Sequence, residues 1–81
     1  MTFYDFVIEK YLGKDSPRGD LAYDMERDKE YFPVVCDAGQ RSRQKIKDYL
    51  QRRNACRECL KTFGYCWTSY RNYMKKQMDM F

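Results

Sequence analysis

The chain has 81 residues, of which 43% are hydrophobic, 35% are charged and only six are glycine or proline. This composition excludes a collagen-like chain, a low-complexity linker and an acidic disordered tail. A chain of this length forms one small domain that buries about 60% of the surface its unfolded form exposes. No apolar run approaches the roughly 20 residues of a membrane helix, and the N-terminus lacks the features of a signal peptide. We therefore expect a soluble, cytoplasmic protein that does not bind membranes.

The net charge of +4 hides an uneven distribution along the chain. Residues 1–37 carry five basic and nine acidic side chains, whereas residues 38–76 carry eleven basic and two acidic ones. The first part therefore has a net charge of −4 and the second a net charge of +9. A split of this size predicts a dipolar molecule with one strongly positive side.

Histidine is absent from the sequence. This removes the commonest general base and the usual metal ligand. The chain also lacks a nucleophilic serine motif and a glycine-rich phosphate loop. The sequence thus predicts a protein that is not an enzyme and that needs no cofactor.

Two helices are predicted before residue 34. Thr2 is suited to cap a first helix, and Gly13 to end it in the left-handed conformation. Asp15-Ser16-Pro17 starts a second helix, because a capping side chain precedes a proline in the first turn. Phe32-Pro33 is expected to end that helix, since the residue before a proline is pushed out of the helical region.

Residues 34–40 form a connector, in which Val34-Val35-Cys36 could be extended and buried. A third helix follows from about Arg41, and Asn54 is expected to cap a new helix or mark a bend. From Cys56 onward apolar residues sustain one helical stripe, which Gly64 either interrupts or leaves continuous. These elements predict an all-α fold, with four or five helices in a single domain spanning residues 1–81 and a core within about 2–76. The predicted core residues are Phe3, Phe6, Val7, Leu21, Met25, Phe32, Ile46, Leu50, Leu60, Phe63, Trp67 and Tyr70.

The order of several residues resembles the YozE family of small bacterial proteins. They are Phe3-Tyr4, Phe6, Gly13, Asp15-Ser16-Pro17, Gly19-Asp20-Leu21-Ala22, Asp24, Asp28, Phe32-Pro33, Ile46, Tyr49-Leu50, Phe63, Trp67 and Tyr70. The resemblance runs over about residues 2–70 and is densest between Asp15 and Asp24. It implies a helical bundle similar to sterile alpha motif (SAM) domains, but no known reaction, and such proteins also occur on bacterial mobile elements.

Three features depart from the family pattern. Gly64-Tyr65 stands where the family usually has an acidic pair, and Lys45 where it tends to have an acidic residue. The family's second half is also not generally this basic. The partner of this chain is therefore expected to differ from that of an ordinary member.

The chain has four cysteines: Cys36, Cys56, Cys59 and Cys66. The last three fall on the apolar stripe of the last helix, so packing as small hydrophobic residues is the favoured interpretation. A tetrahedral zinc site of all four thiolates is an alternative, although such sites usually use two short cysteine pairs and only one is present. A redox or disulfide role is a third alternative, but the sequence lacks the βαβ context that would favour it.

Asp20, Asp24 and Asp28 recur every four residues and therefore stack along one face of the second helix. Such a column could bind a hard cation or raise the pKa of one carboxyl group. Because Asp20 lies near the helix start, capping and a solvated face with basic neighbours are the favoured interpretation.

Eight basic residues crowd into residues 41–61. They are Arg41, Arg43, Lys45, Lys47, Arg52, Arg53, Arg57 and Lys61. Arg43 and Lys47 share a helix face, which Arg52 and Arg53 extend around the bend. If five or six of these residues contacted phosphates, duplex binding would fall by about 0.9 log unit per contact for each tenfold rise in salt.

The favoured function is that of a non-catalytic interaction module that binds a protein partner through its acidic and basic sides. The same polarity permits head-to-tail self-association of the acidic second helix with the basic third helix. Tyr65, Tyr70 and Tyr73 are expected to be exposed and to serve a protein interface or stack on bases. The alternative is therefore a DNA- or RNA-binding module that uses the third helix and the start of the last one. A variant of it is a mobile-element protein that inhibits a host nucleoprotein, such as a defence effector.

Overall fold

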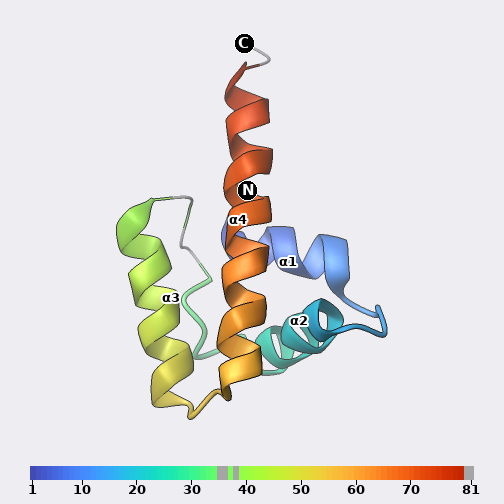
Figure 1. Ribbon diagram of the computed structural model, residues 1–81, viewed down its shortest axis with the longest axis vertical. Helices are drawn as coiled ribbons and strands as arrows, with labels where there is room; N and C mark the ends of the chain where they lie inside the picture. Colours follow the sequence, from blue (N-terminus) through green and yellow to red (C-terminus); the bar gives the residue numbers. More distant parts are fainter. Residues whose placement is uncertain (35–36, 38, 80–81) are drawn as a thin grey trace.

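The computed structural model describes residues 1–34, 37 and 39–79, without the side chains of residues 40, 78 and 79. It contains helices α1 (Phe3–Tyr11), α2 (Pro17–Arg27), α3 (Gln40–Arg52) and α4 (Arg57–Asp79), and the described residues contain no strand. The predicted all-α fold is confirmed, with four helices in the residues that the structure describes. Helix α4 stands in the centre, with α3 antiparallel to it on one side and α1 and α2 on the other (Figure 1). In the described part of the chain, no helix has both the length and the apolar composition to cross a membrane.

The ends of α1 and α2 follow the capping residues that the sequence indicated. The Thr2 hydroxyl accepts a hydrogen bond from the Asp5 N–H at 3.2 Å, and the Ser16 hydroxyl accepts one from the Gly19 N–H at 3.1 Å. Gly13 follows α1 with a φ of 86°, in the left-handed region that favours glycine. Local capping chemistry therefore sets where α1 begins and ends and where α2 begins.

Helix α2 ends at Arg27, so the expected end at Phe32-Pro33 is wrong. A turn follows, in which the Asp28 carbonyl accepts hydrogen bonds from the N–H groups of Tyr31 and Phe32. This turn folds Phe32 back into the core, where it is 4% exposed. The burial of the Phe32 ring, rather than the proline that follows it, therefore determines where α2 ends.

Helix α4 runs without a break through Gly64, and an aromatic cluster covers its inner face. The Phe3 ring lies 5.5, 5.3 and 5.6 Å from the ring centroids of Phe63, Trp67 and Tyr70. All predicted core residues are buried except Leu60, which is half-buried, and Tyr4 and Ala22 belong to the core as well. Aromatic packing thus joins α1 to α4.

Candidate functional site

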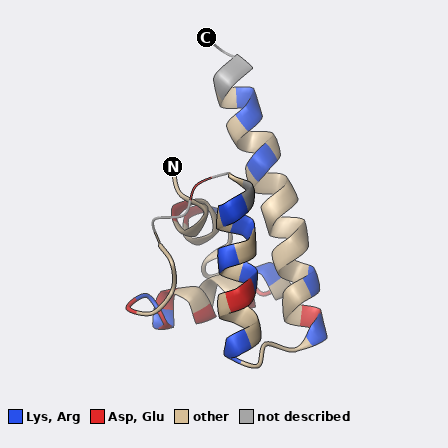
Figure 2. Ribbon diagram, turned by 90° about the vertical axis from the view of Figure 1, so that its left-hand side faces the viewer, with Lys and Arg blue, Asp and Glu red and all other residues tan. Residues whose placement is uncertain are grey.

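Basic residues recur along α3, which faces the viewer in Figure 2, and most of their side chains are exposed. Among the described residues, α4 is the one helix that α3 packs against. Only Ile46 and Leu50 are therefore buried among the described side chains of α3. Residues 41, 45 and 52 lie on one flank of α3, and residues 43 and 47 lie on the opposite flank. Four of these five side chains are exposed, and the fifth, Lys47, is half-buried.

Few of these cations are neutralised within the molecule. Of the eight predicted binding residues, only Arg53 forms an ion pair with a described carboxylate. Asp48, an acidic residue on α3, instead accepts a hydrogen bond from the Gln44 amide at 2.8 Å. Arg57 and Lys61 are exposed in the first turns of α4 and continue the positive charge past the turn after α3. We call the seven residues other than Arg53 the basic surface.

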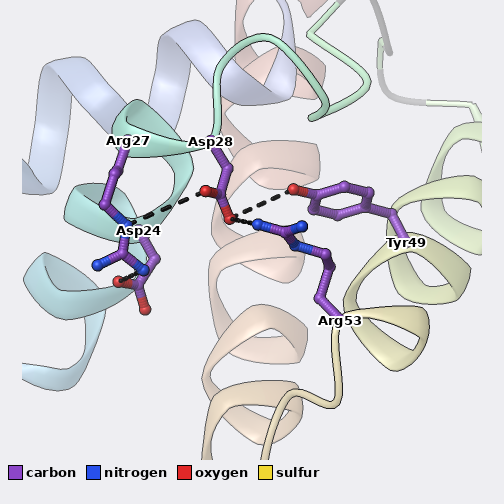
Figure 3. A network of polar contacts seen from close by, with 5 residues as sticks. All are labelled: Asp24, Arg27, Asp28, Tyr49 and Arg53. Carbon is purple, nitrogen blue, oxygen red and sulfur yellow. Dashed lines mark hydrogen bonds and ion pairs between the residues drawn. The ribbon is translucent and has the colours of Figure 1, made fainter.

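Arg53 belongs to a network that joins α2 to α3 (Figure 3). Its Nη2 lies 2.9 Å from Asp28 Oδ2, which also accepts a hydrogen bond from the Tyr49 hydroxyl at 3.4 Å. The hydrogen bond that Arg53 donates to Asp28, followed by the charge of that carboxylate, raises the pKa of Arg53. Burial, followed by the negative charge of Asp28, raises the pKa of Tyr49. The Arg53 guanidinium therefore stays positively charged and the Tyr49 hydroxyl stays protonated, as their contacts with Asp28 require.

The column of aspartates divides between solvent and this network. Asp20 and Asp24 are exposed, and Asp24 pairs with Arg27 of the same helix at 3.4 Å. Asp28 has a side chain only 21% exposed and pairs with Arg53, the residue that follows α3. The expectation of a solvated face with basic neighbours therefore holds for the first two residues. Asp28 has the expected basic neighbour, Arg27 at 4.0 Å, but it is half-buried rather than solvated.

A recess of about 330 Å³ opens between the turn after α2 and the last turns of α3. It is lined by Tyr31, Pro33, Lys45, Tyr49, Arg52 and Arg53. The Arg53 guanidinium lies 5.9 Å from the centroids of both the Tyr31 and the Tyr49 ring. Tyr31 is 69% exposed, so much of its surface is open to solvent. Cations and aromatic rings thus meet in one hollow.

A larger groove of about 500 Å³ shares Tyr49, Arg52 and Arg53 with this recess. The buried residues Leu21 and Met25 form part of its lining. The two hollows meet at the network around Asp28. This network therefore shapes both sides of the junction between α2 and α3.

The predicted interface tyrosines have different environments. Tyr65 is 55% exposed on α4, as expected. Tyr73 is half-buried, and its ring lies 5.4 Å from that of Phe6. Tyr70 was expected both in the core and among the exposed tyrosines; the core prediction is confirmed and the exposure is wrong, because this residue is 0% exposed and its hydroxyl donates to the Met1 carbonyl.

The sequence reasoning missed two tyrosines of the recess, Tyr31 and Tyr49. Tyr31 lies in a turn, off every apolar stripe, and an aromatic residue in such a polar segment is the signal that could have found it. The helical spacing of Tyr49 with Ile46 and Leu50 indicates that it faces inward, and its contacts with Phe32 and Asp28 confirm that direction. Only the folded chain brings the two rings to the same hollow.

The cysteines have separate environments as well. Cys56 precedes α4, is exposed, and accepts a hydrogen bond on Sγ from the Cys59 N–H at 3.4 Å. Its expected place on the apolar stripe is therefore wrong, because it caps the helix instead. Cys59 is half-buried and Cys66 is buried, and burial raises the pKa of Cys66 to about 11. The described residues contain no group of three potential metal ligands, and Cys36 of the zinc alternative lies outside them.

Comparison with known proteins places the chain in a family. No curated protein and no solved structure matches it. A family model described as the YozE SAM-like fold matches residues 2–72. This range includes α1, α2, α3 and most of α4, together with every described residue of the recess. By this match over most of its length, the chain belongs to the YozE SAM-like fold family.

Proposed function

We propose that this protein is a non-catalytic module that binds nucleic acid on the exposed side of α3. The observation that carries the proposal is the basic surface: five cations on the two flanks of one exposed helix, and two more at the start of α4, without a described carboxylate partner. Unpaired surface charges of one sign attract a partner of the opposite sign. The sequence alone put a protein partner first, and the arrangement of these charges favours nucleic acid.

The spacing of the cations suits a polyanion of high charge density. Arg41 and Lys45 are separated by about 6 Å along the helix axis, and Lys45 and Arg52 by about 10 Å. A nucleic-acid strand carries a phosphate every few ångström, about 3.4 Å per strand in a duplex. One strand can therefore contact several residues of one flank at the same time.

The experiment is a titration of short labelled DNA and RNA strands, single and duplex, at several salt concentrations. Fluorescence anisotropy gives the dissociation constant at each salt. If Lys45 contacts a phosphate, Lys45→Gln should lower the slope of log affinity against log salt by about one. Lys14→Gln is the matched control, because Lys14 is an exposed lysine in the turn between α1 and α2. Equal slopes for both variants and the wild type contradict the proposal.

The opposite flank is tested by Arg43→Glu combined with Lys47→Glu. Arg53→Glu is unsuitable for this purpose, because it would place a carboxylate beside Asp28 in the network of Figure 3. A loss of binding in that variant would then report a disturbed fold. Charge reversal at residues 43 and 47 leaves the network intact.

A protein partner is the second candidate, and the acidic side of the molecule favours it. Asp5 and Glu9 on α1 and Asp20 on α2 are exposed, and none of them pairs with a described cation. These carboxylates could meet the basic surface of a second copy, although Asp28 is already engaged by Arg53 of its own chain. Light scattering at low and high salt tests this arrangement. A monomer mass that stays constant at high protein concentration in low salt contradicts self-association.

A further inference from the structure

We infer that the recess between Tyr31 and Tyr49 holds one unstacked nucleobase, so that the module prefers single-stranded over duplex nucleic acid. This inference rests on the proposed function and names the form of the partner. It starts from the coincidence of two tyrosines and three cations in one hollow at the edge of the basic surface. Its volume of about 330 Å³ lies at the lower end of the range of ligand pockets, which suits a single small group.

The walls of the recess are suited to stacking. Tyr31 is 69% exposed, and the guanidinium of Arg53 lies 5.9 Å from its ring centroid. The ion pair with Asp28 at 2.9 Å holds this guanidinium in place and neutralises its charge. Arg53 therefore acts as a planar surface beside the tyrosines more than as a free charge. Aromatic rings and guanidinium planes are the groups on which proteins stack the bases of single strands.

The edge of the recess is suited to a phosphate. Lys45 and Arg52 line it, and neither forms an ion pair with a described carboxylate. Arg52 donates a hydrogen bond from Nε to the Asp48 carbonyl at 3.4 Å, which leaves its charge uncompensated. Lys45 and Arg52 also belong to the same flank of α3 as Arg41. A strand that places a base against Tyr31 can thus lay its backbone along this flank.

A base that is paired within a duplex cannot enter the recess in the same way. Both faces of a paired base are covered by its neighbours, and only its edges face the grooves. Seating a duplex base in the recess would require its removal from the stack, which costs a few kcal/mol. A single strand avoids this cost. The preference therefore follows from the shape of the recess, whereas the charge alone would accept either form.

The test measures how a single-stranded oligothymidine and a duplex of the same length bind to Tyr31→Ala at fixed salt. Because stacking of one base contributes about 1–3 kcal/mol, the single-strand affinity should fall roughly 5- to 150-fold while duplex affinity stays constant. Tyr31→Phe keeps the ring and should bind like the wild type. Tyr23→Ala is the control, since Tyr23 is 61% exposed on α2 and does not line the recess. A strand that contains 2-aminopurine reports stacking directly, through quenching that Tyr31→Ala removes.

The outcomes separate this inference from the proposed function. Equal single-strand affinity of Tyr31→Ala and wild type, or duplex binding as tight as single-strand binding, overturns the inference. In that case the salt slope of Lys45→Gln still decides the proposed function. If no oligonucleotide binds and an acidic, tyrosine-phosphorylated peptide does, both are overturned and the recess serves a protein partner. The melting temperature of each variant confirms that it is folded.

Discussion

The carboxylate of Asp28 receives the guanidinium of Arg53 at 2.9 Å and the hydroxyl of Tyr49 at 3.4 Å, and so fastens the end of α2 to the last turns of α3. Asp28→Asn preserves the shape of the side chain and removes its charge. The melting temperature should fall, and 1 M salt should narrow its difference from the wild type, because screening weakens the native ion pair. Asp20→Asn, on an exposed position of the same helix, should melt within a few degrees of the wild type. Equal melting temperatures for Asp28→Asn and wild type would contradict a stabilising role for the network.

Alkaline pH should destabilise the protein through Cys66. Burial raises the pKa of this thiol from 9.0 to about 11, so the folded state holds the neutral form. Because the thiol of the unfolded chain ionises first, this stability is complete below about pH 9 and is lost as the pH rises toward 11. A difference of two pKa units corresponds to about 2–3 kcal/mol. Urea unfolding of wild type and Cys66→Ala across this range checks the prediction.

The slope of stability against pH is the quantity to compare in that experiment, because Cys66→Ala also changes the packing. Burial raises the pKa values of Cys59, Tyr4 and Tyr49 as well, so part of the alkaline loss should remain in the variant. Parallel curves for the two proteins would contradict the assignment to Cys66.

Alanine should have opposite effects at two helical glycines. At Gly19 a Cβ atom would overlap the backbone carbonyl of Lys14, so the turn between α1 and α2 would have to move. We expect Gly19→Ala to lower the free energy of unfolding by about 1–3 kcal/mol. At Gly64 a Cβ would meet no atom within 4 Å, and Gly64→Ala should raise the free energy of unfolding by up to about 1 kcal/mol. Urea denaturation of both variants is the measurement, and a change of the same sign in both would contradict this account.

Trp67 should be among the most costly residues to truncate. It is 3% exposed, and its ring lies 5.3 Å from that of Phe3 and 5.6 Å from that of Tyr70. Trp67→Ala should lower the free energy of unfolding by about 3–5 kcal/mol, which is a large part of the stability of a small domain. Tyr65→Ala, on the exposed side of the same helix, should change it by about 0.5 kcal/mol or less. Far-UV circular dichroism during heating distinguishes these results, and a cooperative melt of Trp67→Ala within a few degrees of wild type would contradict the packing.

The sequence predicted the helices well, because their signals are local. Thr2, Gly13 and Ser16 act within a turn of the positions they cap, and the apolar stripe of α4 shows its inner face directly. The expected end of α2 was wrong because a long-range demand, the burial of Phe32, ends the helix early.

The candidate site was only partly predictable for the same physical reason. A run of cations is visible in the sequence, so the basic surface was found. Tyr31 and Arg53 are 22 positions apart, and periodicity shows which way a side chain faces but not which helix it meets. The pairing of Asp28 with Arg53, and with it the recess, depends on the folded arrangement that brings the residue after α2 to the residue after α3.

The two ends of the fold are unequal places for a fusion partner. The Tyr70 hydroxyl donates to the Met1 carbonyl at 2.6 Å, so the start of the chain lies against the middle of α4. The last turns of α4 project beyond the other helices, at the opposite end from the turn that joins α3 to α4 (Figure 1). An affinity tag attached after α4 should therefore extend away from the other helices on a sensor chip, whereas a tag before Met1 would press on the folded body.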